Sequence, residues 1–336
     1  MREVERILLA HGSGGELSRR LVEEEVLRYF DDPVLGRLED AARVPAFPGR
    51  PALTTDAFVV RPLFFPGGDI GKLAVYGTVN DLAMAGARPR YLSLAWVLEE
   101  GLELAVLRRV LASAARAAKA AGVAVVAGDT KVVERGKADG LYLISAGVGE
   151  VPPGRDLGPA RLRSGDRILV SGPVGDHGMA VLSRREGMEF EGEVVSDCAP
   201  LAGLVEEILA AGEVHCLRDP TRGGLVAALK EVAAAAGMAS EVTEAAIPVR
   251  PAVRAACSIL GLDPLHLANE GKLVAWVAPQ DAAAVLAAMR RHPLGREAAQ
   301  IGEVLEGEPG RVVLTTPWGG RRRLELLVGE DLPRIC

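Results

Sequence analysis

The sequence predicts two domains, each built from mixed helices and strands of the α/β or α+β class. Its 336 residues are many for one domain and suit two domains of roughly 150 residues each. Strand-like and helix-like runs alternate through the first half, and the second half repeats that pattern. Between the halves, residues 151–159 (VPPGRDLGP) concentrate breakers between two apolar runs. We therefore place domains at 1–152 and 153–327, followed by a tail at 328–336.

The first half alternates short apolar runs with longer runs of helical spacing. The alanine-rich run at residues 102–121 is typical of a helix, and the run at 91–97 has the composition of a strand. Turn residues separate these runs. We expect strands over residues 51–55, 91–97, 123–127 and 141–148, and helices over residues 70–85 and 102–121.

The second half contains a strand-like run at residues 168–171, followed by helices that we expect to begin near Gly178 and Gly224. The periodicity does not determine the order of the strands in a sheet. Residues 317–320 (PWGG) indicate a hairpin turn, with the last strand at 321–327. The remaining nine-residue tail would reach about 30 Å at roughly 3.3 Å per extended residue.

Charge and hydropathy exclude several classes of partner. The net charge of -6 and the pI near 5.6 argue against nucleic acid or an anionic membrane. The sequence has no apolar run of the roughly 18 residues that a membrane helix needs, and its first residues lack the apolar region of a signal peptide. We therefore expect a cytoplasmic protein that binds neither nucleic acid nor membrane.

Four scattered cysteines do not form a disulfide scaffold and suit a reducing compartment. Cys198 and Cys216 lack a second pair at the spacing of a zinc site, and Cys257 lies in an apolar stretch. We expect these three thiols to be structural. The fourth cysteine, Cys336, is the last residue of the chain. Because chain ends are usually chemically idle, its role depends on the other motifs.

Four aspartates lie where loops meet expected helices and strands. Asp56 and Asp129 stand at or after the ends of strands, Asp81 lies within the first long helix, and Asp219 precedes the helix at Gly224. Each of them alone is more simply explained as a cap or turn residue, and Asp219 as the start of that helix. Together they offer the oxygen ligands that Mg²⁺ uses beside nucleotide phosphates. Neighbouring cations, Lys131, Arg218 and Arg222, favour the phosphate interpretation.

Two glycine-rich loops offer further candidate phosphate contacts. Residues 11–16 (HGSGGE) precede a predicted helix, and Ser13 with Glu16 also fits a capping box that needs no ligand. Residues 172–178 (GPVGDHG) lie between a strand and a helix, as in a turn that cradles phosphate, but match neither the Walker A nor the Rossmann pattern.

Seven motifs follow one another from residue 11 to the last residue given. They are residues 11–15 (HGSGG), 62–73 (PLFFPGGDIGKL), 80–81 (ND), 128–133 (GDTKVV), 219–224 (DPTRGG), 269–272 (NEGK) and 333–336 (PRIC). Together they resemble the motifs of the HypE family of hydrogenase maturation factors. The resemblance implies the synthetase-like (PurM-like) fold shared with aminoimidazole ribonucleotide synthetase, selenophosphate synthetase and thiamine-monophosphate kinase. That fold has an N-terminal α/β domain whose strands pair across a homodimer, a C-terminal α+β domain, and ATP in the cleft between them.

The resemblance also implies an activity for the terminal thiol. In this family a carbamoyltransferase, HypF, places a carbamoyl group on the terminal cysteine as a thiocarboxamide. ATP then drives its dehydration to a thiocyanate, and the cyano group passes to iron on the HypC–HypD complex. The iron centre of [NiFe]-hydrogenase obtains its cyanide ligands in this way.

The resemblance implies a role for each site residue. Cys336 would be the carrier and Glu270 the general base, with Lys131 as the alternative base or as the group that orients the amide. The residues implied to bind ATP are Asp56, Lys72, Asp81, Asp129, Thr130, Asp219 and Arg222, and the implied Mg²⁺ ligands are the four aspartates among them. Without the resemblance, Glu270 is equally explained as an exposed turn residue.

Two other functions remain open. A small-molecule synthetase or kinase similar to selenophosphate synthetase would carry its reactive cysteine or selenocysteine near the N-terminus, where residues 11–15 contain no cysteine. A non-enzymatic scaffold would bind nucleotide and dock maturation partners through the tail.

Overall fold

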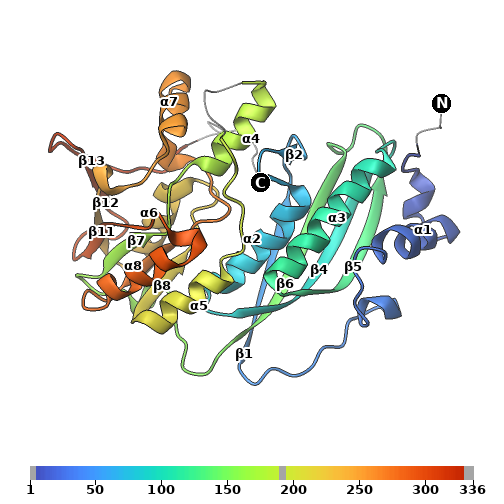
Figure 1. The fold of residues 1–336 in the computed structure, drawn as a ribbon, viewed down its shortest axis with the longest axis horizontal. Helices are drawn as coiled ribbons and strands as arrows, with labels where there is room; N and C mark the ends of the chain where they lie inside the picture. Colours follow the sequence, from blue (N-terminus) through green and yellow to red (C-terminus); the bar gives the residue numbers. More distant parts are fainter. Residues whose placement is uncertain (1–4, 189–193, 329–336) are drawn as a thin grey trace.

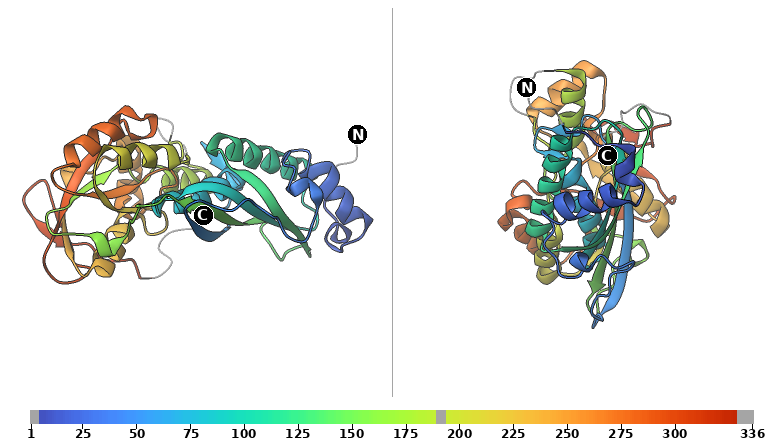
Figure 2. Two further views of the ribbon diagram at one scale, coloured as in Figure 1. Left: turned by 90° about the horizontal axis from the view of Figure 1, so that it is seen from below. Right: turned by 90° about the vertical axis from the view of Figure 1, so that its right-hand side faces the viewer.

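The computed structural model describes residues 5–188 and 194–328, so the predicted carrier Cys336 lies outside the described residues. The chain forms two halves side by side, each built on its own sheet (Figure 1). The views in Figure 2 show the molecule as elongated, with the two sheets at opposite ends of the long axis. No helix within the described ranges is long and apolar enough to span a membrane.

The first half contains a mixed four-stranded sheet in the order β1-β6-β4-β5. β4 and β5 are parallel, and the other neighbours are antiparallel. Along β4, the buried residues Leu92, Leu94, Trp96 and Leu98 alternate with half-buried ones, as the two-residue period of a strand requires. The strands are β1 (Arg50–Phe58), β4 (Arg88–Glu99), β5 (Ala124–Val133) and β6 (Leu141–Val151).

Two helices cover the face that bears these buried residues, namely α2 (Ile70–Met84) and α3 (Leu104–Ala121) (Figure 1). Asp69 caps α2 by accepting hydrogen bonds from the N–H groups of Gly71 and Lys72. Gly122, with a φ of +68°, ends α3 in the left-handed conformation that favours glycine. The two helices predicted in this half are confirmed.

The predicted strands of this half are also confirmed, and all four run further than expected. β1 continues to Phe58 and β5 to Val133, so Asp56 and Asp129 lie inside strands and not at their ends. The apolar pattern of β5 stops at Ala127, where the predicted strand ends, and the polar run from Gly128 to Lys131 follows. Its backbone nevertheless stays paired with β4, after a one-residue bulge near Val126.

A short N-terminal segment and a small hairpin complete the first half. The expected capping box does not form, because Gly15 is the N-cap of α1 and the Ser13 hydroxyl donates to the carbonyl of Ala10 (2.9 Å). The Ser18 hydroxyl instead accepts from the N–H of Gly14 (2.9 Å). These elements are the 3-10 turns η1 (Leu9–Gly12) and η3 (Leu35–Arg37), α1 (Glu16–Arg20), the π turn η2 (Leu21–Val26), β2 (Phe64–Phe65) and β3 (Gly68–Asp69).

The second half contains a seven-stranded sheet in the order β13-β12-β9-β11-β7-β10-β8, in which only β9 and β12 run parallel among its described neighbours. The predicted strand at residues 168–171 is confirmed. The last strand is shorter than the predicted 321–327, although the hairpin turn before it is confirmed. The strands are β7 (Arg167–Val170), β8 (Val214–Arg218), β9 (Ala239–Thr243), β10 (Val274–Val277), β11 (Ala299–Leu305), β12 (Val312–Thr315) and β13 (Arg321–Arg323).

Helices pack on both faces of this sheet. α6 packs on the face that carries Trp276, while α5, α8 and the end of α2 pack on the face that carries Ala275. The end of α2 therefore joins the cores of the two halves. The predicted helices near Gly178 and Gly224 are confirmed. The helices are α4 (Asp176–Glu186), α5 (Ala202–Ala211), α6 (Gly224–Ala236), α7 (Pro251–Leu260) and α8 (Ala282–Arg291), with 3-10 turns η4 (Pro159–Arg161), η5 (Glu244–Ala246), η6 (Pro264–His266) and η7 (Pro293–Gly295).

Candidate active site

Residues of both halves line a cavity of about 200 Å³ beside β1. β1 and α2 contribute from the first half, and the loop before α6 and the loop before β10 contribute from the second. The lining contains four carboxylates and two guanidinium groups. The lining residues are Asp56, Ala57, Phe58, Gly77, Asp81, Arg218, Asp219, Thr221, Arg222 and Glu270.

Burial and mutual repulsion raise the pKa of three acidic groups of this cavity, Asp56, Asp219 and Glu270. Burial, with a contribution from the Asp81 charge, raises the pKa of Asp56 to about 6. The same two causes raise the pKa of Asp219 to about 7. Burial, followed by the charge of Asp219, raises the pKa of Glu270 well above its ordinary value. Such shifts in one cavity are typical of a functional site.

The local structure places each carboxylate for reasons other than helix capping. Asp81 lies on α2, and the Thr54 hydroxyl donates to its carboxylate (2.8 Å). Gly223 occupies the N-cap of α6, so Asp219 does not initiate that helix. Glu270 is only 3% exposed, and the exposed-turn interpretation of this residue is therefore wrong.

Two consecutive glycines fix the loop that carries Asp219 and Arg222. Gly223 and Gly224 have φ values of +76° and +63°, in the left-handed region that favours glycine. A Cβ on Gly224 would lie 2.5 Å from the carbonyl oxygen of Leu265. The close approach brings the loop against the segment that leads to Glu270.

Three predicted residues lie elsewhere within one chain. Asp129, Thr130 and Lys131 line a separate hollow of about 420 Å³, together with the N-terminal glycine loop around His11 and Gly12. Lys131 and Asp129 are exposed there and form an ion pair (3.2 Å). Within a single chain, the four predicted metal-ligand aspartates therefore do not meet at one cavity.

Lys72 does not line this cavity. Its ammonium group donates to the carbonyl of Gly67 (2.7 Å) and lies 5.8 Å from the centroid of the Tyr76 ring.

Three N–H groups of the second glycine loop, residues 172–178, are already bonded within the protein. The N–H of Val174 donates to Pro248, that of Gly178 to Ala268, and that of Gly175 to the side chain of Asn269. These three groups are therefore not available to a phosphate.

The cavity suits a hard divalent cation in its donor type but holds no preformed cage. Asp56, Asp81 and Asp219 offer only oxygen ligands. The raised pKa values of Asp56 and Asp219 reflect burial first and then neighbouring negative charge, which a cation would neutralise. Across residues 5–188 and 194–328, no group of three or more His, Cys, Asp or Glu side chains is already arranged to hold a metal ion. This combination fits Mg²⁺, which usually takes one or two carboxylates and completes its shell with water and phosphate.

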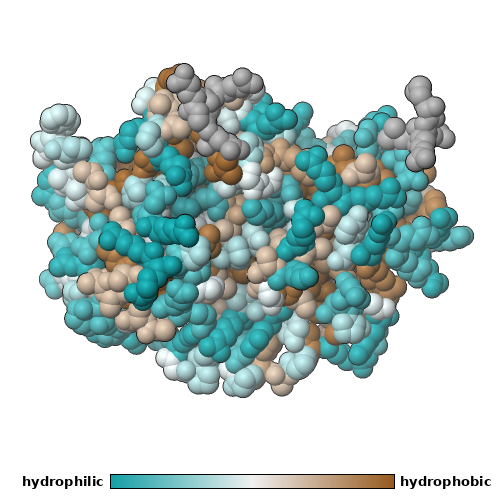
Figure 3. Space-filling model, in the orientation of Figure 1, coloured by the Kyte–Doolittle hydropathy of each residue, from teal (hydrophilic) through white to brown (hydrophobic). Residues whose placement is uncertain are grey.

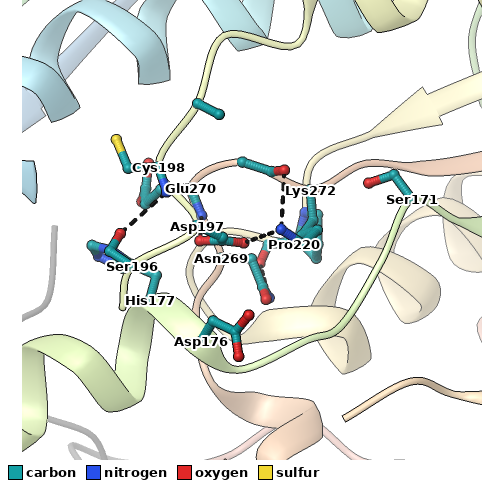
Figure 4. A network of polar contacts seen from close by, with 12 residues as sticks. Ser171, Asp176, His177, Ser196, Asp197, Cys198, Pro220, Asn269, Glu270 and Lys272 are labelled. Atoms are coloured by element: carbon teal, nitrogen blue, oxygen red, sulfur yellow. Dashed lines mark hydrogen bonds and ion pairs between the residues drawn. The ribbon is translucent and has the colours of Figure 1, made fainter. Parts of the chain in front are cut away.

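A polar network behind Glu270 was missed by the sequence analysis (Figure 4). Asp197 accepts from the N–H of Glu270 (3.0 Å), and Asn269 joins the second glycine loop to Pro220. Asp197 lies in a segment without regular structure, where no motif or periodicity distinguishes it. Cys198, Cys216 and Cys257 are buried, which confirms their structural interpretation.

Comparison with known proteins first defines a class. The models of the AIR synthase related protein family match both halves, the N-terminal domain over residues 38–151 and the C-terminal domain over residues 163–315. The chain is thus a two-domain protein of the AIR synthetase-like (PurM-like) class, as the sequence motifs implied.

Closer relatives define the family. Carbamoyl dehydratase HypE of Bradyrhizobium diazoefficiens is 53% identical over 330 residues, which cover 98% of this chain and 95% of that protein. A crystal structure of the hydrogenase maturation protein HypE in complex with ATP has a TM-score of 0.95 at 50% identity, covering 98% of this chain and 99% of that one. A structure of a HypE–HypF complex has a TM-score of 0.81 at 44% identity, covering 91% and 99%. The chain belongs to the carbamoyl dehydratase HypE family of hydrogenase maturation proteins.

Proposed function

We propose that this chain is an ATP-dependent carbamoyl dehydratase that supplies the cyanide ligands of the [NiFe]-hydrogenase iron centre. Cys336, the last residue of the chain, carries a carbamoyl group as a thiocarboxamide, and the enzyme converts this group to a thiocyanate. The observation that carries the proposal is the cavity between the halves, where a buried Glu270 shares the lining with three aspartates and two arginines.

The chemistry divides into two steps. An amide oxygen is a poor leaving group, so the γ-phosphoryl group of ATP is first transferred to it, with loss of one amide proton. Cleavage of the carbon–oxygen bond then releases phosphate while a base takes the second proton, which leaves a carbon–nitrogen triple bond on sulfur. Glu270 is the proposed base, because its raised pKa makes the ionised carboxylate a stronger proton acceptor. Lys131 assists it or orients the amide.

ATP and Mg²⁺ are the proposed cofactors. Phosphoryl transfer depends mainly on positioning and charge neutralisation, which Mg²⁺ supplies when it is bound. Asp56, Asp81 and Asp219 would hold the ion at the cavity, and Arg222 lies beside them as a phosphate ligand. We retain Lys72, Asp129 and Thr130 as further ATP-binding residues, with Asp129 also as a metal ligand.

A homodimer would account for the position of Asp129 and Lys131. By strand register they lie on the sheet face opposite α2 and α3, together with Ile144 of β6. The side chains of this face are only half-buried, and Leu53 is 75% exposed. By contrast, polar and apolar residues are interspersed on the side that carries α3 (Figure 3). We propose that a second copy covers the open face, so that Asp129 and Lys131 of each copy lie at the interface.

The proposed partners are those of the family. HypF would load Cys336, as the HypE–HypF complex of a relative supports, and the HypC–HypD complex would receive the cyano group. We propose that this exchange takes place in the cytoplasm, where the few scattered cysteines of the chain stay reduced.

Mass spectrometry of the C-terminal peptide tests this function. After incubation with carbamoyl phosphate, HypF and ATP, the peptide should gain the mass of a carbamoyl group and then lose one water. Cys336→Ala should give neither product while ATP binding stays nearly intact. A modified free substrate with an unmodified peptide would indicate a small-molecule synthetase, and no modification at all would indicate a scaffold.

A further inference from the structure

We propose that Asp197 is a positioning residue for the dehydration step and that, through an ion pair with Lys272, it holds Glu270 at the cavity. This inference rests on the proposed function, because it assigns Asp197 a role only through the proposed base.

The carboxylate of Asp197 contacts the residues on both sides of Gly271. Oδ1 of Asp197 accepts from the N–H of Glu270 (3.0 Å), and Oδ2 lies 3.2 Å from Nζ of Lys272 (Figure 4). Both side chains are buried, at 3% exposure for Asp197 and 10% for Lys272. Separating this buried pair would leave an uncompensated charge, which is strongly destabilising. The two side chains therefore stay together.

The backbone of the two segments is packed too tightly to slide. A Cβ on Gly271 would lie 1.8 Å from the carbonyl oxygen of Asp197. The N–H of Ala199 donates to the carbonyl of Glu270 (3.3 Å). Residues 197–199 therefore form a fixed support directly behind residues 270–272.

Hydrogen bonds from α2 connect residues 197–199 to the first half. The side-chain amide of Asn80 donates to the carbonyls of Ala199 (3.0 Å) and Glu270 (3.3 Å), and its oxygen accepts from the N–H of Leu201 (2.8 Å). Glu270 is thus held at its N–H by Asp197 and at its carbonyl by Asn80 and Ala199. Asp81, the next residue on α2, lines the cavity that Glu270 faces.

Both backbone groups of Glu270 are fixed, so the remaining freedom lies in its side chain. A base displaced by about 1 Å loses on the order of 100-fold in rate, because proton transfer needs hydrogen-bond reach. Loss of the Asp197 support should accordingly slow dehydration while leaving the aspartates that bind nucleotide in place.

The test measures the conversion of carbamoylated to dehydrated C-terminal peptide at saturating ATP, alongside ATP affinity by calorimetry. Asp197→Ala removes the hydrogen bond and the ion pair, and we expect the rate to fall about 10- to 100-fold with ATP affinity unchanged. Asp197→Asn keeps an acceptor for the N–H of Glu270 but not the ion pair, and we expect an intermediate loss.

Asp166→Asn is the matched control. Asp166 is also buried, accepts from the N–H of Arg163 (2.8 Å) and pairs with a basic side chain, that of His215 (2.7 Å). The Asp166→Asn variant should have a lower thermal stability than the wild-type protein but a dehydration rate within about twofold of the wild-type rate.

A wild-type rate in Asp197→Asn, or a loss of ATP affinity in parallel with the loss of rate, overturns the positioning role. If the wild-type protein forms no thiocyanate, the proposed function itself fails, and the two failures are thereby distinguished.

Discussion

At the scale of single residues, the cavity contains buried carboxylates whose negative charge is unfavourable until a cation neutralises it. Asp219 is buried with like charges nearby, and its pKa rises from 3.8 to about 7. In the range between these values the folded protein binds the proton more tightly than the unfolded chain. The contribution of Asp219 to stability is therefore present below about pH 4 and is lost as the pH rises towards 7.

Asp219→Asn should consequently stabilise the nucleotide-free protein at pH 8 by about 2 kcal/mol and leave its stability at pH 4 nearly unchanged. Urea denaturation in the presence of EDTA measures both values. Asp156→Asn, at an exposed carboxylate that does not line the cavity, is the control and should show little difference between the two pH values. A destabilised Asp219→Asn protein at pH 8 would mean that this carboxylate makes favourable contacts that outweigh its burial.

Glu270→Gln should accept a carbamoyl group from HypF but form thiocyanate at least about 100-fold more slowly, because an amide does not take up the proton. Time-resolved mass spectrometry of the C-terminal peptide would then show the carbamoylated form accumulating. Glu308→Gln, at an exposed glutamate paired with Arg323, should behave as wild type. Normal thiocyanate formation in Glu270→Gln would leave Lys131 as the candidate base.

At the scale of elements, the sequence predicted the helices and strands better than their ends. The composition of residues 91–97 and the alanine-rich run at 102–121 are local signals, and the strand and helix that they predict are confirmed as β4 and α3. The polar run at Gly128 to Lys131 lacks the pattern of a strand, and its pairing with β4 is what keeps it in β5.

The candidate site likewise combines features that the local sequence indicates with features that depend on the tertiary structure. Asp81, Asp219, Arg222 and Glu270 belong to the sequence motifs, whereas Asp56 was predicted from its place at the end of an expected strand. The fold brings all five to one cavity. Their burial could not be read from the sequence, since it depends on the packing of two halves that are distant along the chain.

The loop that enters α6 gives a prediction at this scale. Gly224→Ala should destabilise the protein by about 3 kcal/mol or more, because its Cβ meets backbone atoms of residues 265–267 in addition to the cost of a left-handed φ. Gly237, at the other end of the same helix, has a φ of +68° and open space around it. Gly237→Ala should therefore cost only about 1 kcal/mol. Chemical denaturation of both variants measures the difference, and equal costs would contradict the close approach.

At the scale of the whole molecule, the two halves meet through the end of α2, and the open face of the first sheet points away from the helices. Its half-buried side chains and exposed Leu53 contrast with the buried alternate positions on the same strands. An open sheet face with an exposed leucine of this kind is typical of a surface that another protein covers.

Leu53→Arg should therefore weaken the proposed dimer, since it would place two like charges near the symmetry axis or against the apolar side chains of the second copy. Sedimentation velocity should show the wild-type protein at twice the 35.3 kDa chain mass and the variant shifted towards the monomer. Ile259→Arg is the matched control, because Ile259 is 79% exposed but lies on α7, far from this sheet along the chain. If Leu53→Arg remains as dimeric as Ile259→Arg, the sheet face is not the interface. In that case Asp129 and Lys131 would have to reach the nucleotide within a single chain.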